Sequence, residues 1–262
     1  MEYIEYERTG ETATITLDNP AFRNALTLGM AKEISEAVAR VEESDARCLV
    51  LQGSDGTFCA GGDIKSMLEG LSDDRDMEEM IQEAALPVNR SVQHVYECSV
   101  PTVAKVDGQA YGAGATLALA CDVVLASERS ELSFGFQRIG LSVDSGTSYL
   151  LPRAVGQKKA MDLVYTGDVI DADRAEELGI VSRVVPTEEF ESEATELVET
   201  VATGPTVALE HSKELLQHGA DRSFDEVIEA EKDGLRACFA SEDFETGVRS
   251  FVNKETPEFV GE

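Results

Sequence analysis

VDGQAYGAGATLALACDVVLAS, residues 106–127, is the stretch that decides how this chain folds. It continues an apolar run at 101–106 that predicts a buried strand. A glycine-containing turn at 108–114 follows, and a helix of very small residues is expected from about Ala115. The stretch ends in a second apolar run at 121–126, also predicted to be a strand. A strand, a helix and a strand in this order indicate parallel strands in an α/β core.

A second turn, FCAGGDI at 58–64, shares this design, because it also follows a short apolar strand and opens a helix. Backbone N–H groups at a helix start have no partner within the helix and carry the positive end of its dipole. Two such turns side by side could place two N–H donors on one oxygen, which is an oxyanion hole. From the pattern alone, the two turns could also bind phosphate or could simply be tight turns that allow close helix packing. Neither turn fits the GxGxxG or GxxxxGK[ST] phosphate-binding patterns.

The rest of the chain supports an α/β core followed by helices. Alternating or apolar runs predict strands at 3–8, 12–18, 48–52 and 131–134. A helix is expected from Thr27, a plausible N-cap, to about Glu43, with one apolar face formed by Met30, Ile34, Ala37, Val38 and Val41. Other helices are expected from Ile64 and up to Cys98. The acidic stretch 69–79 is expected to be an exposed loop or helix. From Gly156 onwards only helical patterns are visible, and 262 residues suit one large domain or one domain with a small helical appendage.

The charge of the chain excludes several classes of partner. It has 51 Asp and Glu against 22 Lys and Arg, so the formal net charge is −29. Nucleic acids and anionic membrane surfaces bind basic proteins, and neither is expected here. No apolar stretch is long enough to span a bilayer, and the acidic N-terminus is not a signal peptide. We therefore expect a cytoplasmic protein.

The cysteines and histidines predict no metal site. The five cysteines are widely spaced, form no CxxC pair and are not near any of the three histidines. Reduced cysteines in a cytosolic protein are the expected state.

Several blocks in order resemble those of the enoyl-CoA hydratase/isomerase (crotonase) family. They are FCAGGDIK (58–65), the 106–127 segment, IGLSVDSGTSYLLPRAVG (139–156) and YTGDVIDADRAEELGIVSRVVP (165–186). The likeness runs from NPAFRNAL (19–26) to SEDFETGVRSFVNKETPEF (241–259). It implies a crotonase-like ββα spiral core over 1–200 and a C-terminal helical trimerisation region over 201–262.

The resemblance also implies a homotrimer or a homohexamer whose C-terminal helices pack across subunits. Phe251 and Lys254 could then reach a neighbour's CoA site.

The resemblance also implies a site for an acyl-CoA thioester, with no permanently bound cofactor. Gly62 and Ala113 are the positions that supply the two oxyanion N–H donors. Main-chain atoms of the first block are expected to hold the adenine of CoA, and the backbone of the 19–26 block lines the same site. Lys65 and Arg23 are placed to meet CoA phosphates, although both could be ordinary surface charges. The implied CoA-binding residues are Arg23, Ala25, Ala60, Asp63, Ile64 and Lys65, with Ala21 beside them.

The acid–base residues divide the family, and this chain lacks the two glutamates of its hydratases. One glutamate position is Thr116 here, and the positions nearest the other are Gln137 and Arg138. Neither a threonine nor an arginine can act as a general base near neutral pH. The carboxylate that stands in the expected pocket is Asp144, where isomerase-type members often carry an aspartate.

Asp144 is therefore the candidate base, with the alternative that it caps a helix starting at Ser145. Ser142 and Tyr149 are polar candidates nearby. The resemblance then favours proton transfer that shifts a double bond in an enoyl-CoA. The alternatives are an enoyl-CoA hydratase, a ring-closing or thioester-hydrolysing relative, and a non-catalytic acyl-CoA binder.

The charge generates a prediction about salt. Acidic residues are spread along the chain and repel one another unless ions screen them, so we expect a protein adapted to a high-salt cytoplasm. The melting temperature should rise steeply between dilute buffer and molar KCl, as followed by circular dichroism. Equal stability in the two media would exclude salt adaptation.

Overall fold

The computed structural model describes residues 1–72 and 76–262. Its main sheet has six strands in the order β1-β2-β3-β4-β6-β9. β1 pairs with β2 antiparallel, and the other neighbours in this sheet are parallel. The strands are β1 (Ile4–Thr9), β2 (Thr12–Leu17), β3 (Cys48–Gly53), β4 (Thr102–Val106), β6 (Val123–Ser127) and β9 (Arg183–Val185).

A smaller sheet of three short strands carries the second glycine turn. Its order is β5-β7-β8, with β5 and β7 parallel and β7 and β8 antiparallel. The strands are β5 (Gln109–Tyr111), β7 (Glu131–Ser133) and β8 (Val169–Asp171). Since β5 leads directly into a helix, this sheet fixes where that helix begins.

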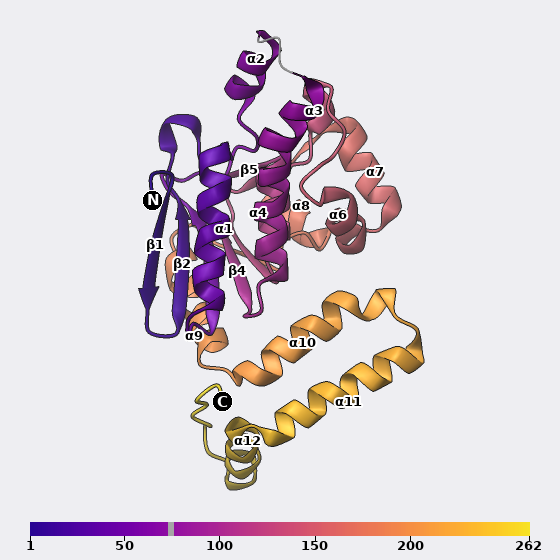
Figure 1. Ribbon diagram of the computed structural model, residues 1–262. Coiled ribbons are helices and arrows are strands. Elements are labelled where there is room, and N and C mark those ends of the chain that lie inside the picture. Colours follow the sequence, from indigo (N-terminus) through magenta and orange to yellow (C-terminus); the bar gives the residue numbers. More distant parts are fainter. Residues whose placement is uncertain (73–75) are drawn as a thin grey trace.

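Helix α1 (Leu28–Glu42) forms as its sequence predicts. The Thr27 side chain accepts a hydrogen bond from the N–H of Met30 at 3.1 Å, so Thr27 is the N-cap. The predicted apolar face is buried along its whole length. This face covers the main sheet, and α4 (Leu86–Glu97) lies beside α1 (Figure 1).

The core contains further helices and single turns. They are α2 (Ile64–Ser72), α3 (Met77–Met80), a π-helical turn (Ile81–Ala85), α5 (Ala113–Leu119), a 3-10 turn (Phe136–Ile139), α6 (Thr147–Val155), α7 (Gln157–Thr166), α8 (Ala172–Glu177) and α9 (Phe190–Ala202). Of these, α2 begins at Ile64, as predicted. A further 3-10 turn, Pro20–Phe22, lies between β2 and α1.

Three sequence-based expectations are wrong. The small-residue helix begins at Ala113 rather than near Ala115, and β5 lies within the expected turn. The chain after Gly156 is not wholly helical, because it contains β8 and β9. Each missed strand has three residues, too few to show an alternating pattern, and each is defined by pairing with a strand distant in sequence. Part of the acidic stretch 69–79 lies outside the described residues.

Three helices follow the core and extend away from it (Figure 1). They are α10 (Thr206–His218), α11 (Phe224–Ala240) and α12 (Glu242–Asn253), with a 3-10 turn at Gly219–Asp221. The buried ammonium group of Lys213 holds α10 to the core through Asp122, at 2.9 Å, and the carbonyl oxygen of Val100, at 3.0 Å. Arg47 binds the start of α10 through the hydroxyl of Thr206, at 2.6 Å.

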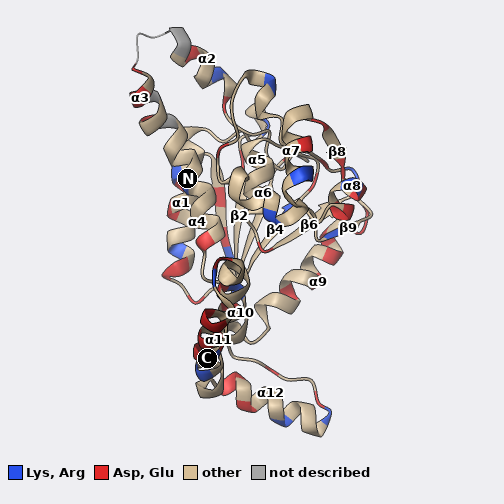
Figure 2. Cartoon of the chain, turned by 90° about the vertical axis from the view of Figure 1, so that its right-hand side faces the viewer, with Lys and Arg blue, Asp and Glu red and all other residues tan. Residues whose placement is uncertain are grey.

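Acidic side chains are distributed over the outer helices, including α9, α11 and α12 (Figure 2). Among the helices described by the structure, none is long and apolar enough to cross a membrane. No group of three or more potential metal ligands occurs within 1–72 and 76–262.

Candidate active site

Two hydrogen bonds join the two glycine turns side by side. The N–H of Cys59 donates to the carbonyl oxygen of Gln109 at 2.9 Å, and the N–H of Tyr111 donates to the carbonyl oxygen of Cys59 at 2.9 Å. These bonds form an isolated parallel bridge between Cys59 and Ala110. The bridge therefore places the starts of α2 and α5 next to each other.

Glycine is required at two places in this junction. Gly61 has a φ of 95°, and a Cβ added there would lie 2.6 Å from the carbonyl oxygen of Tyr111. A Cβ at Gly114 would collide with the carbonyl oxygen of Cys59. Any side chain at either position would push the two turns apart.

The N–H groups of Gly62 and Ala113 are left available by this arrangement. Across the described residues, no hydrogen bond uses either group as a donor, whereas the N–H groups of Cys59, Ala60 and Tyr111 are all engaged. Ala113 is the first residue of α5, and Gly62 stands two residues before α2. The predicted oxyanion donors thus lie at adjacent helix starts.

The 19–26 segment packs along the first turn. The N–H of Ala60 donates to the carbonyl oxygen of Arg23 at 3.0 Å, and the N–H of Leu26 donates to that of Gly61 at 2.7 Å. The fully buried side chain of Asn24 ties this segment down, since its Nδ2 donates to the carbonyl oxygen of Thr57 at 2.8 Å. The two blocks expected to line a CoA site are therefore in contact.

The predicted CoA-binding side chains have different environments. Arg23, Ile64 and Lys65 are exposed, and Ala25 is buried. The Lys65 ammonium group lies 5.8 Å from the centre of the Phe22 ring. The Asp63 carboxylate accepts the N–H of Lys65 at 3.1 Å and so caps α2.

The two missing acid positions are filled by groups that cannot take a proton. Thr116 is fully buried and bonds to Thr147, with 2.6 Å between the hydroxyl oxygens. Gln137 and Arg138 both turn towards the C-terminal end of α7: the Gln137 amide donates to the carbonyl oxygen of Tyr165 at 3.4 Å, and the Arg138 guanidinium to that of Gly167 at 2.6 Å.

The side chain from this stretch that lies against the second turn is instead Phe136, which is buried. A Cβ added to Gly112 would be 3.9 Å from its ring. An apolar ring therefore faces the start of α5.

Asp144 lies in the loop before α6 and does not cap that helix with its side chain. The N-cap is Gly146, and the helix begins at Thr147 rather than Ser145, because Ser145 and Gly146 both have positive φ. The hydroxyl of Ser145 donates to Asp144 Oδ1 at 3.0 Å, and no other hydrogen bond to this carboxyl occurs within the described residues. Burial raises the pKa of Asp144, and the Ser145 hydrogen bond opposes that rise.

A chain of hydroxyl groups connects Asp144 to the second turn. The Thr147 hydroxyl bonds to the carbonyl oxygen of Asp144 at 2.7 Å, and the Thr116 hydroxyl bonds to that of Gly112 at 3.2 Å. The two hydroxyl oxygens are 2.6 Å apart, and because they carry two protons between them, one proton serves this contact and the other serves one of the two carbonyl oxygens. The backbone of Asp144 is thereby placed beside the turn that carries Ala113.

The other two polar candidates contribute no group to this junction. Ser142 is exposed, and the Tyr149 hydroxyl donates to Asp221 at 3.2 Å, beyond α10. Sequence reasoning missed Phe136 and also Met67, whose Cε would lie 2.9 Å from a Cβ at Gly62. For Met67, the signal in the sequence was the helical spacing of the apolar residues Ile64, Met67 and Leu68 on α2.

The six-stranded sheet, the small second sheet and the joined turns define the class of protein: this is the crotonase fold of enzymes that act on coenzyme A thioesters. The enoyl-CoA hydratase/isomerase family model matches residues 7–262, and the chain belongs to that family. The α/β fold class and the family resemblance are thereby confirmed.

The relatives carry names of more than one activity. A probable enoyl-CoA hydratase of Rhodobacter capsulatus is 34% identical over 258 residues, covering 98% of each chain. A 1,2-epoxyphenylacetyl-CoA isomerase of Escherichia coli is 32% identical over 263 residues, covering 100% of this chain and 99% of its own. The crystal structure of a putative enoyl-CoA hydratase from Streptomyces coelicolor has a TM-score of 0.92 at 32% identity, covering 99% of this chain and 94% of its own.

The junction generates a prediction at Gly61. Gly61→Ala should lower kcat/KM for an acyl-CoA substrate by about 100-fold or more, the usual effect of losing one oxyanion donor, because the new Cβ separates the turns. Steady-state kinetics would measure this. Gly10→Ala is the matched control, since Gly10 also has a positive φ, 59°, but nothing within 4 Å of an added Cβ. Equal losses in the two variants would show that the Gly61 effect is backbone strain rather than turn separation.

Proposed function

We propose that this enzyme shifts a double bond in an enoyl-CoA by proton transfer, with Asp144 as the base. The observation that carries this proposal is the environment of Asp144. Its carboxyl is half-buried and accepts a hydrogen bond at Oδ1 from the Ser145 hydroxyl, and its backbone carbonyl oxygen is bound by the Thr147 hydroxyl beside the second turn. Oδ2 is then the oxygen that can take a proton. Burial, which raises the pKa of Asp144, makes it a stronger base once ionised.

The reaction proceeds in two proton transfers. Asp144 Oδ2 removes a proton from C2 of a 3-enoyl thioester, and the electron pair moves into a dienolate whose negative charge lies on the thioester oxygen. The N–H groups of Gly62 and Ala113 stabilise that oxygen. Asp144 then returns the proton to C4, which gives the 2-enoyl thioester and restores the carboxylate.

Hydration is the less favoured alternative, because it requires acid–base groups that activate a water molecule. Thr116 and the Phe136 ring occupy the side of the second turn where such groups are needed. A threonine hydroxyl is not a base near neutral pH, and a phenylalanine ring carries no proton to exchange. Met67 adds a further apolar group beside Gly62.

Coenzyme A enters as part of the substrate in this proposal. Main-chain atoms of Ala60, Asp63 and Ile64, beside the backbone of Ala25, hold the adenine. Arg23 and Lys65 supply positive charge to the phosphates. The contacts between the 19–26 segment and the first turn support this assignment.

Deuterium incorporation tests the reaction type. The enzyme is incubated with 3-enoyl- and 2-enoyl-CoA in D₂O and molar KCl, and the products are analysed by mass spectrometry and NMR. Isomerisation gives double-bond migration and solvent deuterium at C2 or C4 without added water, whereas a mass gain of one water would establish hydratase activity. Acyl-CoA binding with neither change would indicate a non-catalytic binder.

Asp144→Asn should lower kcat by about 100-fold to 10,000-fold with little change in acyl-CoA affinity, because the variant loses the base. In the parent enzyme, kcat/KM should fall as the pH drops through the raised pKa of Asp144, since only the ionised carboxylate accepts a proton. Asp168→Asn, at an exposed carboxyl, is the control. Undiminished turnover in Asp144→Asn would exclude this residue as the base.

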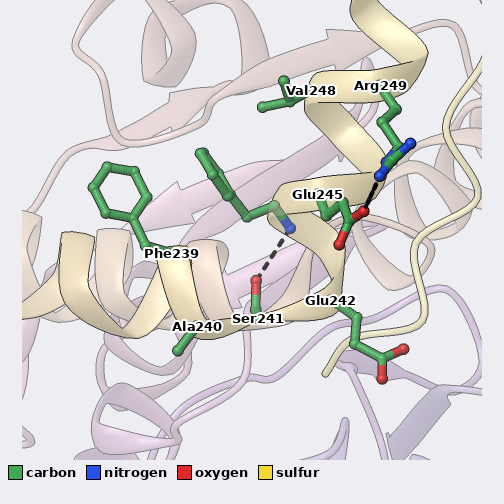
Figure 3. Close-up of a pocket in the computed structure, with 8 residues that line it drawn as sticks. Phe239, Ala240, Ser241, Glu242, Glu245, Val248 and Arg249 are labelled. Carbon is green, nitrogen blue, oxygen red and sulfur yellow. Dashed lines mark hydrogen bonds and ion pairs between the residues drawn. The ribbon is translucent and has the colours of Figure 1, made fainter.

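We also propose that the protein assembles as a homotrimer or a homohexamer through its C-terminal helices. α11 and α12 expose large apolar side chains, including Phe239, Phe244 and Phe251 at 62%, 43% and 86%. A groove of about 600 Å³ runs between the end of α11 and α12, lined by Phe239, Phe244 and Val248 among others (Figure 3). A second copy of the chain would cover this apolar surface.

Sedimentation in molar KCl tests the assembly. The parent protein should sediment as a trimer or hexamer, and Phe251→Asp should shift it towards monomers, because a charge cannot be buried there without a partner. Tyr165→Asp, which changes an exposed aromatic residue of α7, should leave the assembly intact. A monomeric parent protein would refute the proposal.

A further inference from the structure

We propose that Asn89 and Ser145 form a positioning pair that holds the Asp144 carboxyl in both of its protonation states. This inference rests on the proposed function, in which Asp144 gains and returns a proton. Asn89 lies on α4, and Ser145 is buried in the loop before α6. Neither residue belongs to the glycine turns, and Asn89 also lies outside the family blocks.

The contacts within the pair fix the orientation of the Asn89 amide. The backbone N–H of Ser145 is 3.1 Å from Asn89 Oδ1, and the Ser145 hydroxyl is 3.2 Å from the same atom. A backbone N–H can only donate, so the Asn89 atom that faces it must be the amide oxygen. Ser145 has a φ of 53°, an uncommon conformation for a residue with a side chain, and this bond helps to hold it.

The hydroxyl of Ser145 has two acceptors but one proton. Asp144 Oδ1 lies 3.0 Å from the hydroxyl oxygen on one side, and Asn89 Oδ1 lies 3.2 Å away on the other. While Asp144 is ionised, its carboxylate is the stronger acceptor and receives the proton. After Asp144 has taken the substrate proton on Oδ2, its Oδ1 is a weaker acceptor, and the hydroxyl turns to Asn89.

The pair therefore adjusts to each charge state by the rotation of one hydroxyl group. The backbone bond from Ser145 to Asn89 persists in both states, so the carboxyl keeps its position. Without Asn89, the hydroxyl would have Asp144 as its remaining acceptor and would favour the ionised form. Without the hydroxyl, the ionised form would lose its donor.

Other titratable groups line a cavity beside this pair. A cavity of about 370 Å³ lies against Asn89 and Ser145, and its lining includes Tyr96 and Glu97 from α4, Tyr149 from α6 and His218 from α10. Among the described residues, none of these four forms a hydrogen bond or an ion pair with Asp144. Histidine is the side chain that commonly changes charge near neutral pH, so His218 needs its own control.

Two substitutions should move the pH dependence of proton exchange in opposite directions. Ser145→Gly removes the hydroxyl and suits the positive φ. It should move the acid limb of kcat/KM to higher pH by about one unit, the effect of losing a hydrogen bond to a charged group. Asn89→Leu removes the second acceptor and should move the limb to lower pH. Both should lower kcat with KM within about twofold, as expected when groups that act on the base rather than on substrate binding are lost.

The control variants are Gln93→Leu and His218→Gln. Gln93 lies one turn along α4, lines the same cavity and donates to Glu97 at 2.8 Å rather than to Ser145. Both controls should keep the parent pH profile. If Asn89→Leu fails to fold, Asn89→Asp replaces it, and its added negative charge should move the limb to higher pH.

The inference would be overturned if the acid limb of kcat/KM stayed at the parent pH in the Ser145 and Asn89 variants. It would also be overturned if this limb moved in the same direction in Ser145→Gly and Asn89→Leu. These outcomes leave Asp144 as the base if Asp144→Asn is inactive. Retained turnover in Asp144→Asn would instead overturn the proposed function itself.

Discussion

The bridge between Cys59 and Ala110 is the constraint on which the rest of the site depends. Its two backbone hydrogen bonds connect a turn at the end of β3 to the short strand β5, and these segments are separated by about fifty residues of chain. Because both turns run directly into helices, fixing their strands also fixes the helix starts. The absence of side chains at Gly61 and Gly114 follows from this contact, since the two backbones approach too closely for any Cβ.

A site made from backbone donors leaves the side chains around it free to vary. In the proposed site the N–H groups of Gly62 and Ala113 depend on the turn geometry and on little else, so one such junction would serve several reactions on a thioester. In this chain the surrounding groups are apolar or are hydroxyls bonded to each other: Phe136, Met67 and the Thr116–Thr147 pair. The proposed chemistry therefore depends on the carboxyl of Asp144, whose backbone lies beside these hydroxyls.

The sequence predicts what short-range patterns determine. The cap at Thr27, the buried face of α1 and the start of α2 at Ile64 follow from local residue order, and the structure agrees with each. β8 and β9 could not be predicted, because three-residue strands exist through pairing with partners distant in sequence. Predicting that Phe136 lies against the second turn would have required knowing the register of the 3-10 turn to within one residue. Predicting where the loop that contains Asp144 ends would have required knowing that Ser145 has a positive φ, a conformation that serine does not favour.

The acidic surface and the anionic ligand of the family impose opposite electrostatic requirements. CoA phosphates are negatively charged, and a protein of net charge −29 repels them at long range. The two cations proposed to meet them, Arg23 and Lys65, are exposed, and Lys65 lies 3.9 Å from Glu69. The Debye length falls from about 10 Å at 0.1 M salt to about 3 Å at 1 M. Concentrated salt would thus screen the many distant carboxylates more than the few charges in contact with the phosphates. The same screening that relieves repulsion within the folded chain would then let a weak positive patch bind a polyanion.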